Sequence, residues 1–79
     1  PALKLKRALL DHFVSADSAD NLVVVRCLPG TANTIASLLD GMEWPEVMGS
    51  IGGDDTILLI CKTKEQGPQI VKRIQEMMH

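Results

Sequence analysis

Aromatic residues and an excess of positive charge are both missing from this 79-residue sequence. It contains no tyrosine, and Trp44 and Phe13 are its only aromatic residues. Eight lysine and arginine residues stand against ten aspartate and glutamate residues, which gives a formal net charge of -2. A protein that binds nucleic acid by itself usually has a basic surface stripe, and often aromatic side chains on which bases stack. The composition therefore argues against direct nucleic-acid binding by these residues.

Long apolar runs, a signal-peptide pattern and a metal-binding cysteine pattern are also absent. The apolar runs are far shorter than the roughly 20 residues that a membrane-spanning helix needs. Cys27 and Cys61 lie alone in apolar runs, without the close Cys or His spacing of a zinc site, which favours two buried free thiols. We therefore expect a cytoplasmic protein with no membrane partner and no bound metal. Because the sequence begins with Pro1-Ala2 and not with methionine, we also expect a fragment of a longer protein.

A single domain of this size is only marginally stable. The hydrophobic content of 46% allows one core, but a domain this short removes only about 60% of its unfolded surface from water. Small domains usually gain further stability from disulfides, a metal ion or other subunits. Since the sequence indicates neither disulfides nor a metal, we expect association between subunits.

Hydrophobic periodicity and turn residues predict an α+β domain with the element order β-β-α-β-β-α. The expected strands are residues 13–16, 22–28, 47–51 and 56–62, and the expected helices run from a Thr31 cap to about Gly41 and onward from Thr63 or Gly67. Residues 1–12 are interpreted as an interdomain linker or a short amphipathic helix, and residues 13–79 as the domain. The expected fold has two layers, a four-stranded, mainly antiparallel sheet with two helices on one face.

The two long strands are apolar on both faces. Leu22 and Val24 alternate with Val23, Val25 and Cys27, and Leu58 and Ile60 alternate with Ile57, Leu59 and Cys61. Two helices can cover only one face of the sheet, and several exposed side chains of this kind would cost much of the ~5 to 15 kcal/mol that stabilises a domain. The pattern predicts that another subunit covers the second face. The alternative is that residues 1–12 fold back over it.

Asp54 and Asp55 are the most unusual feature of the sequence, because two like charges stand side by side between two glycines and an apolar run. Their repulsion is relieved when a cation lies between them. Four roles are compatible with this arrangement: a solvated turn, a catalytic pair, a metal site that includes Asp40 or Glu43, or a receptor for an organic cation such as a guanidinium. The catalytic and metal roles have the least support, since neighbouring side chains in extended backbone point apart and no nucleophile motif accompanies them.

The helix that follows Thr31 offers groups that complement the acidic pair. Its first amide groups form a partial positive end suited to an α-carboxylate, and the Asn33 amide both donates and accepts hydrogen bonds. Asn33, Ala36, Ser37 and Asp40 share one face at helical spacing. Together with Asp54 and Asp55, these groups suit an amino acid with a cationic side chain. Taken singly, Asn33 and Asp40 are equally typical of ordinary surface residues.

The same residues carry a resemblance to a known family. The segments Gly30-Thr31-Ala32-Asn33, Ile35-Ala36, Leu38-Leu39-Asp40 and Gly49-Ser50-Ile51-Gly52-Gly53-Asp54-Asp55-Thr56-Ile57 together resemble the C-terminal domain of the bacterial arginine repressor. The resemblance runs from about Phe13 to the end of the chain. It implies a domain that forms trimers and dimers of trimers (hexamers) and binds L-arginine at the face between trimers. A separate N-terminal winged helix-turn-helix domain, outside this chain, would then bind operator DNA.

The resemblance also implies a set of ligand-binding residues. By position, Asp54 and Asp55 would bind the guanidinium, Asp40 would help to hold the α-amino end, and Asn33, Ser50 and Gly52 would complete the site. Asn33 stands where the family usually has Gln, Ser50 where Thr is common, and Gly52 where another small residue is found. Because Asn is one methylene shorter than Gln, we expect its ligand contact to be lost or bridged by water, which would change the affinity for L-arginine.

The resulting hypothesis is an effector-binding domain of an arginine-responsive transcriptional repressor of arginine metabolism and biosynthesis. It implies no enzymatic activity and no cofactor, with L-arginine as the co-repressor. One alternative is a small amino-acid-sensing domain that regulates an enzyme. The other is an enzyme that uses Asp54 and Asp55 with a divalent metal.

Overall fold

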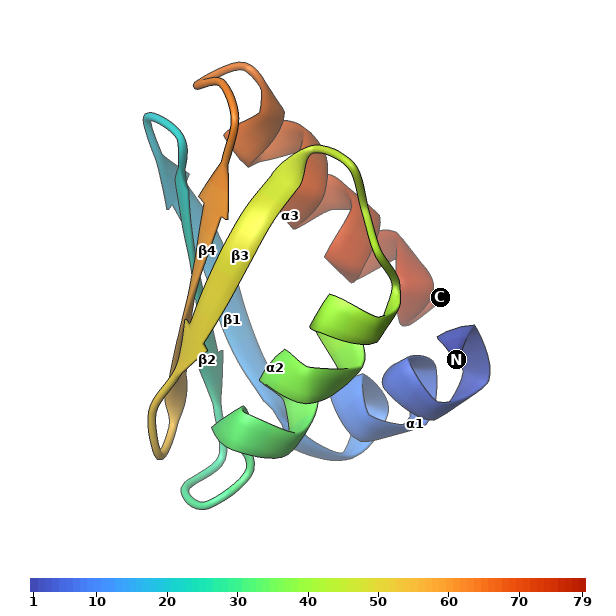
Figure 1. The fold of residues 1–79 in the computed structure, drawn as a ribbon. Helices are drawn as coiled ribbons and strands as arrows, with labels where there is room; N and C mark the ends of the chain where they lie inside the picture. Colours follow the sequence, from blue (N-terminus) through green and yellow to red (C-terminus); the bar gives the residue numbers. More distant parts are fainter.

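The computed structural model describes residues 1–79 as three helices and four strands. The strands are β1 (Phe13–Ala19), β2 (Leu22–Cys27), β3 (Val47–Gly52) and β4 (Thr56–Cys61), and the helices are α1 (Ala2–His12), α2 (Ala32–Gly41) and α3 (Gln66–Met77). All strand pairs are antiparallel, in the order β1-β2-β4-β3 (Figure 1). The predicted α+β class and the four-stranded antiparallel sheet are therefore confirmed.

All three helices lie on one face of the sheet and leave the opposite face open (Figure 1). The sequence predicted two helices on that face, and α1 is the third. Leu5 and Leu9 of α1 are at most 1% exposed and belong to the same core as the strands. Leu3 and Leu10 of the same helix are exposed. Because Leu5 and Leu9 are one helical turn apart, they form a narrow apolar stripe on α1. Residues 1–12 do not fold back over the open face.

The core forms because alternate residues of the central strands face the helices. Val23, Val25 and Cys27 of β2 and Ile57, Leu59 and Cys61 of β4 are all buried on this side. The helices add Ala32, Ile35, Ala36 and Leu39 from α2, and Ile70 and Ile74 from α3. Both cysteines are free and buried, as predicted. No polar side chain is buried with them, so burial of apolar area is the main stabilising term of the fold.

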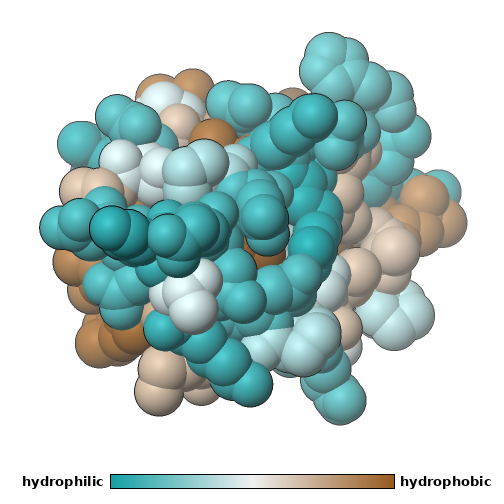
Figure 2. Space-filling model, turned by 90° about the horizontal axis from the view of Figure 1, so that it is seen from above, coloured by the Kyte–Doolittle hydropathy of each residue, from teal (hydrophilic) through white to brown (hydrophobic).

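The opposite side of the sheet carries an apolar surface that we call the open face. It consists of Leu22 and Val24 of β2, Leu58 and Ile60 of β4, and Ile51 of β3. The pairing register places Leu22 beside Ile60, and Leu58 between Val24 and Ile51. Leu22 and Val24 are 37% and 39% exposed, and Ile51 is 63% exposed. Seen from above, the end of the molecule is mostly hydrophilic, but hydrophobic atoms appear at the left edge, on the sheet side (Figure 2).

A polar cluster joins α3 to the segment before β3. The Arg73 guanidinium donates to both Glu46 carboxylate oxygens, at 3.1 and 2.6 Å, and lies 5.0 Å from the centre of the Trp44 ring. These hydrogen bonds lower the pKa of Glu46 to about 2.

Within α3 itself, which begins at Gln66, Pro68 lies in the first turn, where its missing N–H removes no helical hydrogen bond. None of the helices is both long and apolar enough to cross a membrane.

The packing of α1 predicts an asymmetry between its leucines. We expect Leu5→Ala to lower the free energy of unfolding by about 2 to 5 kcal/mol, because it leaves a cavity in the core. Leu10→Ala is the matched control, since Leu10 is 57% exposed, and it should change stability by less than about 0.5 kcal/mol. Urea denaturation followed by circular dichroism measures both. Equally small effects would mean that α1 is not part of the core and would favour a linker role for residues 1–12.

Candidate ligand-binding site

The acidic loop between β3 and β4 lies beside the connection from β2 to α2, at the lower end of the sheet in Figure 1. Three backbone hydrogen bonds hold it there. The Asp54 carbonyl accepts from the N–H groups of Gly30 and Ala32, both at 3.1 Å, and the Asp55 carbonyl accepts from the N–H of Cys27 at 2.7 Å. The backbone of both aspartates is therefore fixed by neighbouring segments, while their carboxylates remain free to meet other groups.

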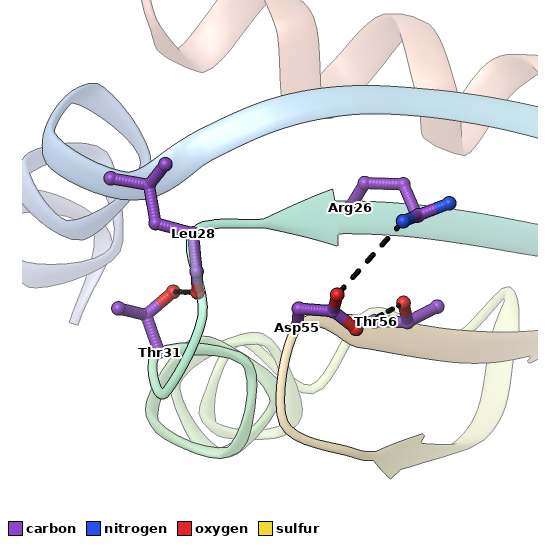
Figure 3. Close-up of polar contacts among 5 residues, drawn as sticks. All are labelled: Arg26, Leu28, Thr31, Asp55 and Thr56. Carbon is purple, nitrogen blue, oxygen red and sulfur yellow. Dashed lines mark hydrogen bonds and ion pairs between the residues drawn. The ribbon is translucent and has the colours of Figure 1, made fainter.

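The two carboxylates have different surroundings. Asp55 accepts a hydrogen bond from the Thr56 hydroxyl at 2.9 Å, and its other oxygen lies 3.9 Å from an Arg26 guanidinium nitrogen (Figure 3). The Asp54 carboxylate is exposed and makes no hydrogen bond or ion pair with the protein. Asp54 is thus open to a ligand, whereas Asp55 is already partly neutralised.

Arg26 is the residue of this region that the sequence analysis missed. It is the second-to-last residue of β2, next to the buried Cys27, and it pairs with Thr56 of β4. A possible signal was present, because Arg26 is the one charged residue in an otherwise apolar strand. The Arg26 side chain is 57% exposed and therefore stays hydrated, and Asp55 is a nearby counter-charge.

The beginning of α2 differs from the expectation in two respects. Thr31 precedes the helix as predicted, but its hydroxyl does not cap it and instead donates to the Leu28 carbonyl at 2.6 Å (Figure 3). The N–H of Ala32 is already bonded to the Asp54 carbonyl. The helix start is therefore only partly available to a ligand carboxylate, through the N–H groups of Asn33 and Thr34, which have no backbone acceptor.

Asp40 and Ser50 lie together, although one belongs to α2 and the other to β3. The Ser50 hydroxyl donates to the Asp40 carboxylate at 2.7 Å. This contact arises because α2 packs across β3, and Ser50 faces the helices, since its pairing partner is the buried Leu59. Asp40 therefore has one oriented oxygen and one that remains free.

Asn33 of α2 and Gly52 of β3 lie close together. A Cβ atom placed on Gly52 would lie 2.8 Å from the Asn33 side-chain oxygen and 3.1 Å from the Ala36 Cβ. The Asn33 side chain thus occupies the space that a larger residue at position 52 would need. The absence of a side chain at Gly52 therefore gives Asn33 room to lie over β3.

A single subunit does not enclose these groups. The surface has two hollows, and neither is lined by Asp54 or Asp55. One, of about 130 Å³, lies beside Asp40 and Trp44, and the other, of about 340 Å³, lies over β1 and β2 next to Arg26. An acidic pair that projects from a fixed loop into solvent can bind a cation firmly only if a second surface covers it.

The structure offers little to the metal and catalytic interpretations of the acidic pair. No group of three or more His, Cys, Asp or Glu side chains is arranged to hold a metal ion. The thiol beside the loop is that of Cys27, and burial together with the Asp55 carboxylate raises its pKa, which disfavours the reactive thiolate. Two roles for the acidic pair therefore remain open, the recognition of a cation and a solvated turn.

Comparison with known proteins identifies relatives. The family model described as "Arginine repressor, C-terminal domain" matches residues 9–76. Proteins named arginine repressor from Halalkalibacterium halodurans, Shouchella clausii and Bacillus subtilis are 53%, 50% and 47% identical to this chain over 78 residues. Each match covers 99% of the chain and 52% of the relative. The chain thus spans about half the length of the curated relatives that it matches.

The contact between Asn33 and Gly52 leads to a prediction. Gly52→Ala should turn the Asn33 amide away from β3, because the new Cβ and the amide oxygen cannot lie 2.8 Å apart. We expect a loss of about 1 kcal/mol in stability, and a clear shift of the Asn33 side-chain NH₂ signals in NMR. Gly49→Ala on the same strand is the control, because nothing lies within 4 Å of a Cβ there. If the Asn33 signals respond equally to both variants, the contact is not specific.

Proposed function

The chain belongs to the arginine repressor family, through the C-terminal domain of that family, and on this premise we propose that it binds L-arginine and assembles the regulator. Arginine repressors are transcriptional regulators and not enzymes, so the two enzyme-linked alternatives have no support from the relatives. The observation that carries the proposal is the acidic loop. Its backbone is held on both sides, while the Asp54 carboxylate has no protein partner.

The chemistry of the loop suits a guanidinium. A planar guanidinium donates to carboxylates in bidentate fashion, and such charge-assisted hydrogen bonds are about twice as strong as neutral ones. We assign this role to Asp54 and Asp55. Because both carbonyl groups are anchored, little conformational entropy is lost when the ligand binds. This pre-organisation supports a receptor role for the loop over that of a mobile, solvated turn.

The remaining groups suit the amino-acid end of the ligand. We assign the α-amino group to Asp40, whose second oxygen is free while Ser50 orients the first. The free N–H groups at the start of α2 suit the α-carboxylate. Asn33, which lies over Gly52, borders the same helix start and would contact the ligand directly or through water.

We place the bound L-arginine between two trimers. The supporting observation is that no hollow of a single subunit contains Asp54 or Asp55. A second subunit would supply the missing wall and exclude water, which strengthens the contact between the guanidinium and the carboxylates. Binding and assembly are then linked, since a ligand that contacts two trimers binds the hexamer more tightly than the trimer.

We infer that the open face is the surface through which subunits form the trimer. It presents apolar side chains from three neighbouring strands, and each of them contributes roughly 1.5 to 3 kcal/mol when fully buried. A contiguous apolar patch of this kind is typical of a protein-protein interface. A second copy of the chain is the expected occupant, because the small domain itself needs further buried area.

The rest of the regulator lies outside this chain. Since the chain spans about half of its relatives, we propose that operator DNA is bound by a separate N-terminal domain, in a cytoplasmic regulator of arginine metabolism. Residues 13–79 would form the arginine-binding and oligomerisation domain, and α1 would connect it to the DNA-binding part. The formal charge of -2 agrees with a domain that makes no DNA contact of its own.

The proposed ligand contacts predict the effect of removing one charge. Asp54→Asn and Asp55→Asn should each lose a contact worth about 1.5 to 3 kcal/mol, and weaken L-arginine binding by roughly one to two factors of ten in calorimetry. Citrulline, which has a neutral urea group, should bind wild type far more weakly than L-arginine. Asp20→Asn, in the turn at the other end of the sheet, is the control and should bind normally. Wild-type affinity in both site variants would leave the loop as a solvated turn.

The proposed interface predicts the assembly state. Wild type should sediment as trimer and hexamer at micromolar concentration, with L-arginine shifting the distribution toward hexamer. Val24→Lys should yield a folded monomer, because it places a charge in the centre of the open face at a position that is 39% exposed in the single subunit. Leu3→Lys on α1, away from the open face, should sediment like wild type. A monomeric wild type, or an unchanged Val24→Lys variant, would contradict this assignment.

A further inference from the structure

The connection between α2 and β3, residues 42–46, joins two groups of the candidate site. Asp40 lies at the end of α2 and Ser50 lies in β3, so the course of this connection sets where the end of α2 lies relative to the strand. Figure 1 shows the connection running upward from α2 to the start of β3, in front of α3. It lies on the helix side of the sheet, opposite to the open face.

Packing fixes the last turn of α2 only in part. Leu39 belongs to the core, but the next residue, Asp40, borders the hollow of about 130 Å³, which Met48 and Gly49 of β3 line as well. An unfilled space supplies no atoms against which a side chain can pack. The direction of the Asp40 side chain therefore depends on the backbone that follows it.

That backbone makes a strained turn at Glu43. The Glu43 N–H donates to the Asp40 carbonyl at 3.1 Å, and Glu43 has a φ of 54°, in the left-handed region that residues with a side chain rarely adopt. A conformation of this kind persists only where the surrounding structure holds it. The residues that follow Glu43 must therefore be held in place.

Arg73 of α3 supplies this hold. Its guanidinium donates to both carboxylate oxygens of Glu46, at 3.1 and 2.6 Å, and lies 5.0 Å from the centre of the Trp44 ring. Bidentate pairing and stacking on an indole fix a guanidinium in orientation as well as in distance. From the other side, the N–H of Lys62, the residue after β4, donates to the Glu46 carbonyl at 3.0 Å. The connection is thus held between α3 and the end of β4, directly after the strained turn.

We propose that Arg73 is a positioning residue for the amino-acid end of the ligand. By holding the residues that follow the strained turn, it directs the Asp40 carboxylate toward the α-amino group. This inference rests on the proposed function, in which Asp40 receives that group. Arg73 contacts Glu46 and Trp44 and acts on the ligand only through Asp40. The acidic loop has its own backbone anchors, so the guanidinium end of the ligand does not depend on Arg73.

The test compares two ligands by calorimetry: L-arginine and 5-guanidinopentanoate, which lacks only the α-amino group. Arg73→Gln removes the guanidinium from Glu46 and Trp44. It should weaken L-arginine binding roughly three- to tenfold, a part of what one charge-assisted contact is worth. It should leave the affinity for 5-guanidinopentanoate unchanged, because this ligand has no group for Asp40. Lys72→Gln is the matched control, since it removes one positive charge from the neighbouring, exposed position of α3 and should change neither affinity.

Two further variants separate positioning from a general loss of stability. Glu46→Gln removes the charge at the other end of the same ion pair and should show the same selective effect on L-arginine. Asp40→Asn should weaken L-arginine binding by itself. Adding Arg73→Gln to it should cause no further loss, because the group through which Arg73 acts is already changed. Circular dichroism checks that each variant is folded at the temperature of the calorimetry.

The outcomes distinguish this inference from the proposed function. If wild type shows no saturable binding of L-arginine, the proposed function fails, and the positioning role fails with it. If wild type binds L-arginine and Arg73→Gln binds it with unchanged affinity, the positioning role alone is overturned. An equal loss of affinity for both ligands in a folded Arg73→Gln variant would also overturn it, as would additive losses in the double variant, since the effect would then not pass through Asp40.

Discussion

The central strands β2 and β4 are apolar on both faces, and this constraint governs the rest of the molecule. Every helix of the chain packs on one side of the sheet and completes a core without buried polar groups. The other side keeps Leu22, Val24, Leu58, Ile60 and Ile51 in contact with water. A domain with a few kcal/mol of stability gains most by burying such a surface against another copy. The same strands therefore organise both the fold of one subunit and the proposed assembly.

The candidate site uses the end of this sheet, where rigidity and exposure occur together. Hydrogen bonds from Cys27, Gly30 and Ala32 hold the backbone of the acidic loop, so its position follows from β2 and α2. The carboxylates of Asp54 and Asp55 remain at the surface, because like charges are more stable in water than in a core. In the proposed assembly, the site is open in one subunit and closes when subunits meet. Ligand binding and assembly are then two aspects of one equilibrium.

Two further contacts shape the surroundings of the acidic pair. Gly52 leaves space for the Asn33 side chain, so the side chains that fit at these two positions depend on each other. Arg26 supplies a counter-charge to Asp55 from the neighbouring strand. Both features lie next to the acidic loop, whose backbone is anchored by other groups.

The sequence by itself determined the features that depend on local periodicity. Alternation with a period of two separated the residues of β2 and β4 into two sets and showed that both faces of the sheet are apolar. The packing of the helices decided which set faces the core. The run from Gly49 to Ile57 was specific enough to indicate the family and the acidic loop. The class, the antiparallel sheet and the helices α2 and α3 followed from the same signals.

Only the tertiary structure decided the contacts between residues that are distant along the chain. The burial of Leu5 depends on where α1 packs, and its short apolar stripe does not reveal this. The pairing of Arg26 with Asp55, and of Asn33 with Gly52, depends on strand order and on how α2 crosses β3. The Thr31 hydroxyl was expected to cap α2, but the loop geometry places it on the Leu28 carbonyl. Periodicity describes which side of an element a residue occupies, but its neighbours across space are set by register and packing, which the whole fold determines at once.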